Sequence, residues 1–286
     1  MAAKFGTAGN PQSFYDEGFT ASKDMPQFLK SKGLDAYEYQ CGKGVSISEA
    51  TAKVLGQNAK EYGIDLSVHA PYYINLANPE EEKINLNIGY VISTLRAARA
   101  MGAKRIVLHT GSLMKMTRRE ALENAKRNLS RILDEVFKEG MEDISICPET
   151  MGKINQLGDL KEVMELCAIS EKLIPTIDFG HLNARTLGGI KAKEDYQRII
   201  DEIACSLGDY YAKNFHSHFS KIEYTAGGEK KHLTFTDSLF GPDFEPLAQV
   251  IAEMKLSPVI ICESAGTQSI DAAAMKNMLE RVQSQV

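Results

Sequence analysis

The side chains best suited to chemistry are histidines and carboxylates that end predicted strands. The chain has only six histidines, and five of them lie at or just beyond the carboxyl end of a short β-branched run. Neutral imidazoles interleaved with carboxylates are the ligands that Zn²⁺ and similar divalent ions prefer. Without an ion, buried carboxylates that face one another would repel and be costly to desolvate. The residues in question are His69, His109, His181, His216 and His218, with Glu149, Asp178 and Glu263.

Eight predicted strands would position these residues, and each is followed by a longer stretch with helical spacing. Eight strand–helix units in 286 residues match the size of a (β/α)₈ barrel, about 250 residues, whose active site lies at the carboxyl ends of the strands. The strands are apolar on both faces, as parallel strands covered by helices must be. The predicted strands are Lys4–Ala8, Tyr37–Gln40, Leu66–His69, Arg105–His109, Ile144–Glu149, Ile174–Asp178, Asn214–His218 and Val259–Glu263.

We therefore predict an α/β fold in which residues 1–286 form a single (β/α)₈ TIM-barrel domain, with the metal site at the C-terminal face of the strands. A doubly wound sheet is the competing fold, but Gly6-Thr7-Ala8-Gly9 is a poor match to the phosphate loop such a sheet carries after its first strand. The sixth histidine, His232, lies in the long irregular stretch 220–242. Connections of that length are usually functional.

Composition narrows the class of protein further. With 43% hydrophobic and 25% charged residues, the chain has the balance of a soluble globular protein. No apolar run is long enough for a membrane helix or a signal peptide, and the five scattered cysteines indicate reduced thiols, so we expect a cytoplasmic protein. The net charge of −5 argues against binding nucleic acid by bulk charge alone, but not through bound cations.

Several segments resemble the endonuclease IV family of apurinic/apyrimidinic endonucleases. The most specific is His69-Ala70-Pro71-Tyr72-Tyr73-Ile74-Asn75-Leu76, which resembles the third strand and loop of that family. The residues His216 and Glu263 match the ligands that close its strands seven and eight. The resemblance implies a barrel with three zinc ions that hydrolyses the phosphodiester 5′ to an abasic site. Further matching segments are 108–112, 149–152 and 177–181.

The resemblance also implies a role for individual residues. The first metal would be held by His69, His109 and Glu149. Glu149 would bridge to a second metal held also by Asp178, His216 and Glu263, and His181 and His232 would contribute to a third. Glu149 and Glu263 would be the catalytic carboxylates that orient a water and accept its proton. Tyr72 and Tyr73 would bind DNA by entering the base stack beside the abasic site.

The chain departs from the family pattern at the third metal. The family has an aspartate two residues before the loop histidine, where this chain has Lys230, whose ammonium has no lone pair to donate. Glu229, one residue out of register, and His218 are the candidate substitutes. We expect two tightly bound Zn²⁺ ions and a weaker third, with Mn²⁺ as an alternative metal, and Lys230 near the phosphate. Other departures are at residues 6–8, 40–44 and 217–220.

The expected function is that of a monomeric, metal-dependent DNA-repair endonuclease acting on double-stranded DNA with abasic sites. A sugar isomerase or epimerase of related barrels is the alternative. One divalent ion on Glu149, Asp178, His216 and Glu263 would serve it, with the two glutamates as acid and base. The additional imidazoles and the Tyr72–Leu76 loop favour the nuclease, since one ion does not require them. A non-catalytic metal-binding scaffold is a third possibility, but it leaves the open mouth and the carboxylate pair unexplained.

Overall fold

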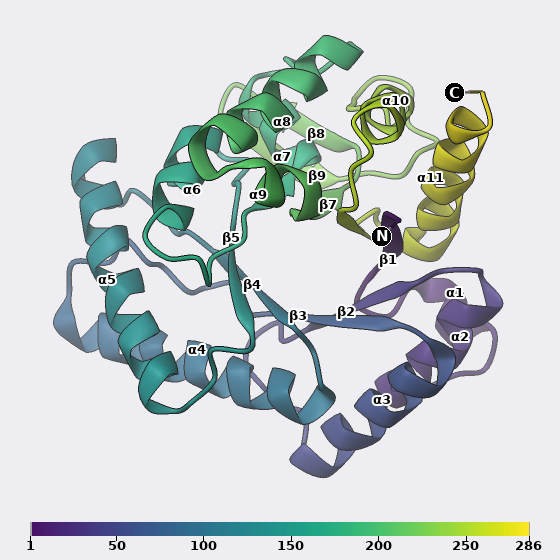
Figure 1. Ribbon diagram of the computed structural model, residues 1–286. Coiled ribbons are helices and arrows are strands. Elements are labelled where there is room, and N and C mark those ends of the chain that lie inside the picture. The colour runs from purple at the N-terminus through teal and green to yellow at the C-terminus, as the bar shows by residue number, and fades with distance from the viewer. Residues whose placement is uncertain (1, 286) are drawn as a thin grey trace.

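The strands of the barrel follow one another in chain order around a closed ring (Figure 1). The computed structural model describes residues 2–285. Each strand pairs in parallel with the next, and the ring closes where the last pairs with the first, from Lys4 opposite Val259 to Thr7 opposite Cys262. The predicted (β/α)₈ barrel is confirmed. Its strands are β1 Lys4–Ala8, β2 Ala36–Gln40, β3 Asp65–His69, β4 Arg105–His109, β5 Ser145–Glu149, β6 Thr176–Asp178, β7 His216–Phe219 and β10 Val259–Cys262.

Helices link the strands and surround the ring (Figure 1). Two of them begin at capping boxes, where the Thr117 and Asp159 side chains accept from the backbone amides of Glu120 and Glu162. No helix within residues 2–285 combines the length and apolarity that crossing a bilayer requires. The helices are α1 Gln12–Asp16, η1 Ser22–Asp24, α2 Met25–Ser31, α3 Glu49–Tyr62, α4 Glu81–Met101, α5 Arg118–Lys138, α6 Leu160–Cys167, α7 Phe179–Arg185, α8 Lys193–Leu207, α9 Asp209–Asn214, α10 Glu245–Glu253 and α11 Gln268–Gln283.

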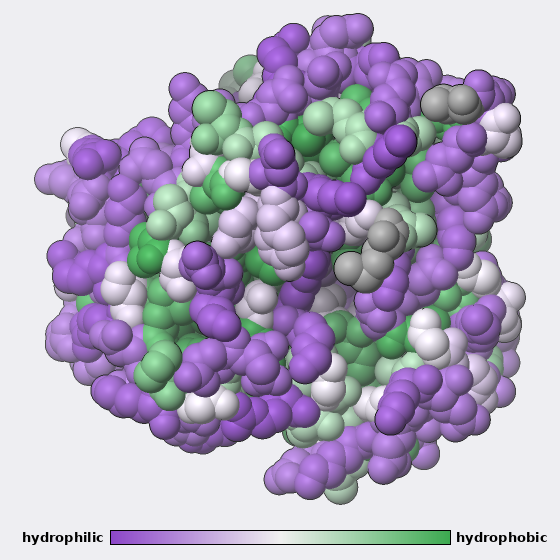
Figure 2. All heavy atoms as spheres, viewed as in Figure 1, coloured by the Kyte–Doolittle hydropathy of each residue, from purple (hydrophilic) through white to green (hydrophobic). Residues whose placement is uncertain are grey.

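The apolar core lies mainly between the strands and the helices. It includes Phe28 and Leu55 from the helices and Val68 and Ile106 from the strands, all fully buried. The face of the molecule seen in Figure 2 is mostly hydrophilic, with smaller groups of apolar residues showing among the polar ones. The interior of the barrel differs, because its fully buried residues include polar and ionisable side chains. Among them are Glu38, Glu149, Asp178, His216 and His218.

A two-stranded hairpin occupies much of the long stretch after β7. It is formed by β8 Ile222–Thr225 and β9 Gly228–His232, paired antiparallel. The register shifts between Glu223, which is opposite Lys231, and Tyr224, which is opposite Glu229. Lys230 is thus the extra residue of a β-bulge, and a bulge changes which residues share a face of the strand.

Candidate metal centre

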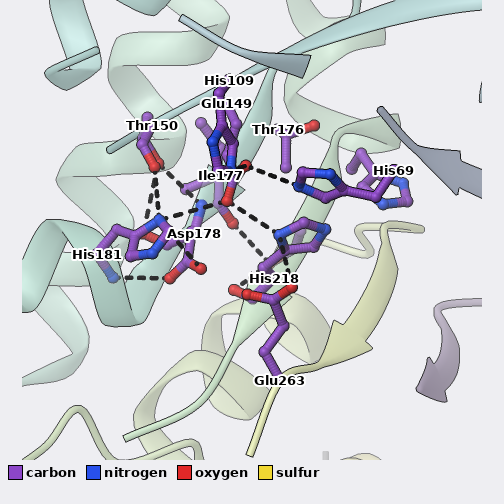
Figure 3. Close-up of polar contacts among 12 residues, drawn as sticks. His69, His109, Glu149, Thr150, Thr176, Ile177, Asp178, His181, His218 and Glu263 are labelled. Atoms are coloured by element: carbon purple, nitrogen blue, oxygen red, sulfur yellow. Dashed lines mark hydrogen bonds and ion pairs between the residues drawn. The ribbon is translucent and has the colours of Figure 1, made fainter. Parts of the chain in front are cut away.

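Glu149 is the meeting point of four histidines at the mouth of the barrel (Figure 3). One of its oxygens, Oε2, lies 3.4 Å from His69 Nε2 and 3.3 Å from His109 Nε2. The other, Oε1, lies 3.0 Å from His218 Nδ1 and 3.3 Å from His181 Nδ1. The carboxylate therefore links donors from strands β3, β4 and β7 and from helix α7.

The backbone fixes which nitrogen of the first two rings faces Glu149. His69 Nδ1 lies 2.7 Å from the carbonyl oxygen of Ala70, and His109 Nδ1 lies 3.0 Å from that of Tyr72. Because a carbonyl oxygen only accepts, each Nδ1 carries a proton and each Nε2 presents a lone pair to the centre when the ring is neutral. This is the arrangement found around histidines that bind metals.

A second set of donors lies directly beside the first. Donor atoms of Glu149, Asp178, His218 and Glu263 all lie within 4.8 Å of one another. Asp178 Oδ1 accepts from the backbone amide of His181 and so caps α7, while its buried Oδ2 has no hydrogen bond within residues 2–285. Three carboxylates around one imidazole, with a buried oxygen that has no hydrogen bond among the described residues and lies 3.3 Å from His181 Nδ1, form a donor set that suits a divalent cation.

The hairpin and helix α7 together supply a third set, made of His181, Glu229 and His232, whose donor atoms also lie within 4.8 Å of one another. Glu229 Oε2 is 3.6 Å from His181 Nε2, and Glu229 Oε1 is 3.9 Å from His232 Nε2. Residues three apart on a regular strand point to opposite faces. The bulge at Lys230 removes this mismatch, so that Glu229 and His232 both reach His181.

The charges at the centre are strongly coupled to one another. Burial alone would raise the pKa of Glu149, but His218, His181 and His69 lower it well below its usual value. Burial raises the pKa of Asp178. For His181 and His218, burial is outweighed by the surrounding carboxylates, which raise the pKa of both rings well above 6.5. Burial lowers the pKa of His109 to about 4. The carboxylates and imidazoles of the centre thus stabilise one another's charged forms.

A cleft of about 280 Å³ opens above the cluster. Its walls include Tyr72, Lys153 and Glu263 together with His109 and His232. Tyr72 is 54% exposed and forms part of the rim. The cleft therefore connects the donor groups to solvent and to any ligand that approaches the C-terminal face.

Comparison with known proteins assigns the chain to a protein family. Residues 26–283 match the model of the xylose isomerase-like TIM barrel family. The chain belongs to this family. An uncharacterized protein of Methanocaldococcus jannaschii is 37% identical over 91% of this chain and 91% of its own length. A probable endonuclease 4 of Staphylococcus carnosus is 26% identical over 77% of this chain and 70% of its own length.

Solved structures of two functional kinds share the fold of this xylose isomerase-like barrel. A D-tagatose 3-epimerase-like protein superposes with a TM-score of 0.75 at 21% identity, covering 99% of both chains. Endonuclease IV from Thermus thermophilus superposes with a TM-score of 0.68 at 16% identity, covering 99% of this chain and all of its own. At these identities the likeness concerns the fold, and the function has to be argued from the site.

Most of the residues predicted for the site do converge, but two are placed differently. His216 begins β7 and lies below the mouth, where its Nε2 donates to Glu38 Oε2 at 2.9 Å. His218, two residues further along the strand, takes the place expected for His216 beside Glu149. Lys230 points away from the centre in an ion pair with Glu223 at 2.5 Å. The predicted residues that come together are His69, His109, Glu149, Asp178, His181, His232 and Glu263.

Tyr72 and Tyr73, in the segment 69–76 that resembles endonuclease IV, differ in their contacts and exposure. Tyr73 packs against Tyr90 with ring centroids 5.0 Å apart, and its hydroxyl donates to the carbonyl oxygen of Lys43 at 3.2 Å. Tyr72 contacts Tyr73 edge to face but leaves more of its surface open beside the cleft. Tyr72 is thus the better placed of the two for contact with a ligand.

Glu38 is a residue of the site that the sequence-based set does not contain. Glu38, in the middle of β2, is fully buried and contacts both His216 and His218. Burial alone would raise its pKa, but those two imidazoles lower it well below the usual value. A glutamate within an otherwise buried parallel strand needs a polar partner. The position of Glu38 in such a strand is therefore the sequence signal that could have identified it as a residue of the site.

Proposed function

We propose that this chain is a metal-dependent phosphodiester hydrolase that cleaves DNA on the 5′ side of abasic sites, as the endonuclease IV family does. The observation that carries the proposal is the overlap of three donor groups, linked by Glu149 and His181. A single ion would be satisfied by the four-residue set that includes Asp178. The other donors would then have no partner ion, although they point into the same centre: His69, His109, His181, Glu229 and His232.

The residues would divide the centre among three ions, with zinc as the proposed metal. His69, His109 and Glu149 would hold the first, and Asp178, His218 and Glu263 would join Glu149 at the second. The hairpin group of His181, Glu229 and His232 would hold the third. Divalent ions in such sites make water a better nucleophile at neutral pH and neutralise charge on the phosphate and on the leaving oxygen.

The protein groups have separate tasks in this scheme. Glu149 is 1% exposed and surrounded by imidazoles, so it orients ligands and holds its negative charge. Glu263 is more open, with its side chain 17% exposed and lining the cleft. We therefore assign to Glu263 the orientation of the attacking water and acceptance of its proton. Lys153, also in the cleft wall, would attract the phosphate.

An abasic site suits the cleft because a nucleotide without a base is already unpaired. Extruding it from the duplex costs less than extruding a paired one, which gives selectivity for damage. Tyr72 at the rim could occupy the space the missing base leaves and stack on its neighbours.

A ketose epimerase is the second candidate, and the set of Glu149, Asp178, His218 and Glu263 favours it. That set could hold one ion while the two glutamates move a proton beside a carbonyl. It does not employ the hairpin group, and we rank it second for that reason.

The test is a duplex with a single tetrahydrofuran abasic analogue, incubated with the zinc-loaded protein and with the same protein after chelation. We expect one cut on the 5′ side of the analogue, loss of cutting with the chelator, and no cutting of the undamaged duplex. The Lys230→Ala protein serves as a matched control that should cut normally, because Lys230 is paired with Glu223 away from the centre. Failure to cut, with epimerisation of a ketohexose by the same sample, would favour the second candidate.

A further inference from the structure

We propose that Glu38 is a positioning residue that keeps the Nδ1 atom of His218 turned toward the metal centre. The proposal deepens the function proposed above and rests on its metal centre. Glu38 lies on β2 and His218 on β7, and both are fully buried inside the barrel. Glu38 does not contact Glu149, Asp178 or Glu263 in any of the donor groups around the mouth, so its influence passes through His218.

The orientation of His218 is the reverse of that of its neighbours. In His69, His109 and His181 the Nδ1 atom lies within 3.0 Å of a backbone carbonyl oxygen, of Ala70, Tyr72 and Thr150 respectively. These carbonyls fix the proton on Nδ1 and leave Nε2 free to bind a metal, on the side of Glu149 in His69 and His109 and on the side of Glu229 in His181.

In His218 the Nδ1 atom itself faces the centre, 3.0 Å from Glu149 Oε1 and 3.7 Å from Glu263 Oε1. An imidazole that gives the Nδ1 lone pair to an ion must carry its proton on Nε2. Glu38 Oε1 lies 2.9 Å from that buried Nε2, at contact distance without an aligned hydrogen bond, and Nε2 has no hydrogen-bond partner within residues 2–285. The Glu38 carboxylate thus faces the nitrogen of His218 that points away from the centre, as a backbone carbonyl faces Nδ1 in the other three rings.

The surroundings of Glu38 keep it ionised and fixed. Its Oε1 accepts from Gln40 Nε2 at 3.2 Å, in addition to the contact with His218. Its Oε2 accepts from Ser67 Oγ and from His216 Nε2, each at 2.9 Å. Four donor groups thus face the two oxygens of one carboxylate.

These contacts also argue against a further ion between Glu38, His216 and His218, although their donor atoms are close enough for one. A carboxylate has about four lone-pair sites, and donors already face them. Moreover, His218 could serve both that ion and the mouth only by losing both ring protons. We therefore assign the group to the support of His218. Carboxylate–histidine–metal chains of this kind fix the ring and raise its basicity.

The first experiment measures zinc affinity by competition with a chromophoric chelator, in wild type, Glu38→Gln and Ser67→Ala. Glutamine has nearly the same shape but is neutral and replaces one acceptor oxygen with a donor. We expect one ion of Glu38→Gln to bind roughly 10–100-fold more weakly, the usual effect of losing such a partner, with the number of ions at saturation unchanged. Ser67→Ala is the matched control, because it removes a donor from the other oxygen of Glu38 and leaves His218 untouched. Its affinity should stay near wild type.

The second experiment reads the tautomer of His218 in the wild-type zinc protein, by NMR with ¹⁵N-labelled histidine and assignment through a His218→Gln variant. We expect a proton on Nε2 and the metal on Nδ1. This measurement stands even if Glu38→Gln does not fold.

The opposite tautomer, or unchanged zinc affinity in Glu38→Gln, would overturn the proposal. So would the loss of one whole ion with the other affinities unchanged, because Glu38 would then be a ligand of a further metal. Neither readout needs nuclease activity. A protein that gives both expected results and does not cut abasic DNA would contradict the proposed function alone.

Discussion

The donors of the centre are held in two different ways. On the barrel side, His69, His109 and Glu149 end strands that are paired on both edges, and the backbone anchors both rings. On the hairpin side, Glu229 and His232 lie on a two-stranded sheet outside the barrel ring, with side chains 16% and 27% exposed. The only side-chain hydrogen bond to the His232 ring among residues 2–285 comes from Ser220, at 2.8 Å.

These two kinds of support explain how one cluster can bind ions with different strengths. Donors fixed by buried packing and hydrogen bonds lose little freedom when an ion binds, whereas donors on a small hairpin have to be ordered first. We therefore expect the barrel side to retain its ions and the hairpin side to release its ion more readily. Phosphate from a bound substrate would add the ligands that the hairpin site lacks.

Glu149→Gln should have the largest effect, because it changes the carboxylate shared by the two ions of the barrel side. The substitution takes away the charge that four imidazoles share, so both barrel ions should be lost. Cleavage of abasic duplex should fall by roughly 10³-fold, the scale seen when a principal electrostatic group is removed. The measurements are metal content after dialysis and initial cleavage rate.

The control for that variant is Glu162→Gln. Glu162 is also buried but accepts from Arg118, at 2.8 Å and 2.5 Å, away from the donor groups. Lower stability with normal metal content is expected there. Equal metal loss in both variants would mean that Glu149 acts through folding and not as a ligand.

Glu229→Gln should lower the metal affinity of the hairpin side without changing that of the barrel side. The third ion alone should weaken, by at least about 10-fold, because it loses one of its protein ligands and not only an outer-shell partner, while the barrel ions remain. Elemental analysis after exhaustive dialysis, against a series of zinc-buffered solutions, measures this. The neighbouring Lys230→Ala is the control and should leave all ions in place. Three tightly retained ions in the Glu229→Gln protein would show that the hairpin carboxylate is not a ligand.

Proton release should distinguish the rings by their protonation before metal binds. The pKa values of His181 and His218 are raised above 6.5, so at neutral pH both rings carry a proton that an ion must displace. His109, with a pKa of about 4, needs no such displacement. Zinc affinity should therefore fall as the pH falls, by about tenfold per pH unit for each proton displaced.

Calorimetry in buffers of different ionisation enthalpy counts these protons directly. Binding with no proton release at pH 7 would contradict the assignment of charged imidazoles to the metal-free centre. The same titration of a His218→Gln protein should release about one proton fewer.

Tyr72→Ala should have the smallest effect on the metals and leave both sides of the centre intact. Loss of a stacking ring should weaken binding to abasic duplex by about 1–3 kcal/mol, or roughly 5- to 150-fold, with metal content unchanged. Tyr73→Ala is the comparison, because Tyr73 is held by Tyr90 and Lys43. Equal affinities for DNA in wild type and Tyr72→Ala would show that Tyr72 only packs on its neighbours.

The barrel side could be predicted from the sequence because its signals are local. A β-branched run that ends in His69, His109, Glu149 or Asp178 fixes the end of the strand, and all strand ends of a parallel barrel meet at one mouth. His216 and His218 could not be separated in this way. They share a face of β7, and the choice between them depends on a displacement of roughly 6–7 Å along the strand, which only the pairing with β6 and β10 determines.

The remaining parts of the site depend on contacts that are distant in the sequence. The position of Glu229 depends on the bulge between β9 and β8, and no residue type in the sequence predicts that bulge. The same bulge turns Lys230 outward to Glu223. Glu38 lies between two tyrosines in β2, and apart from Gln40 its partners are 29 to 180 residues further along the chain. The fold could therefore be predicted from hydrophobic periodicity. The residues that hold the metal ligands in place could be identified only from the structure.

The most direct test of the account is to return zinc stepwise to the metal-free protein and to measure bound metal and cleavage of abasic duplex in the same samples. The account predicts that the barrel ions bind first, that undamaged duplex stays intact throughout, and that cleavage of the abasic strand reaches its full rate only when the hairpin ion is also bound. A protein fully loaded with zinc that leaves the abasic strand intact would contradict it.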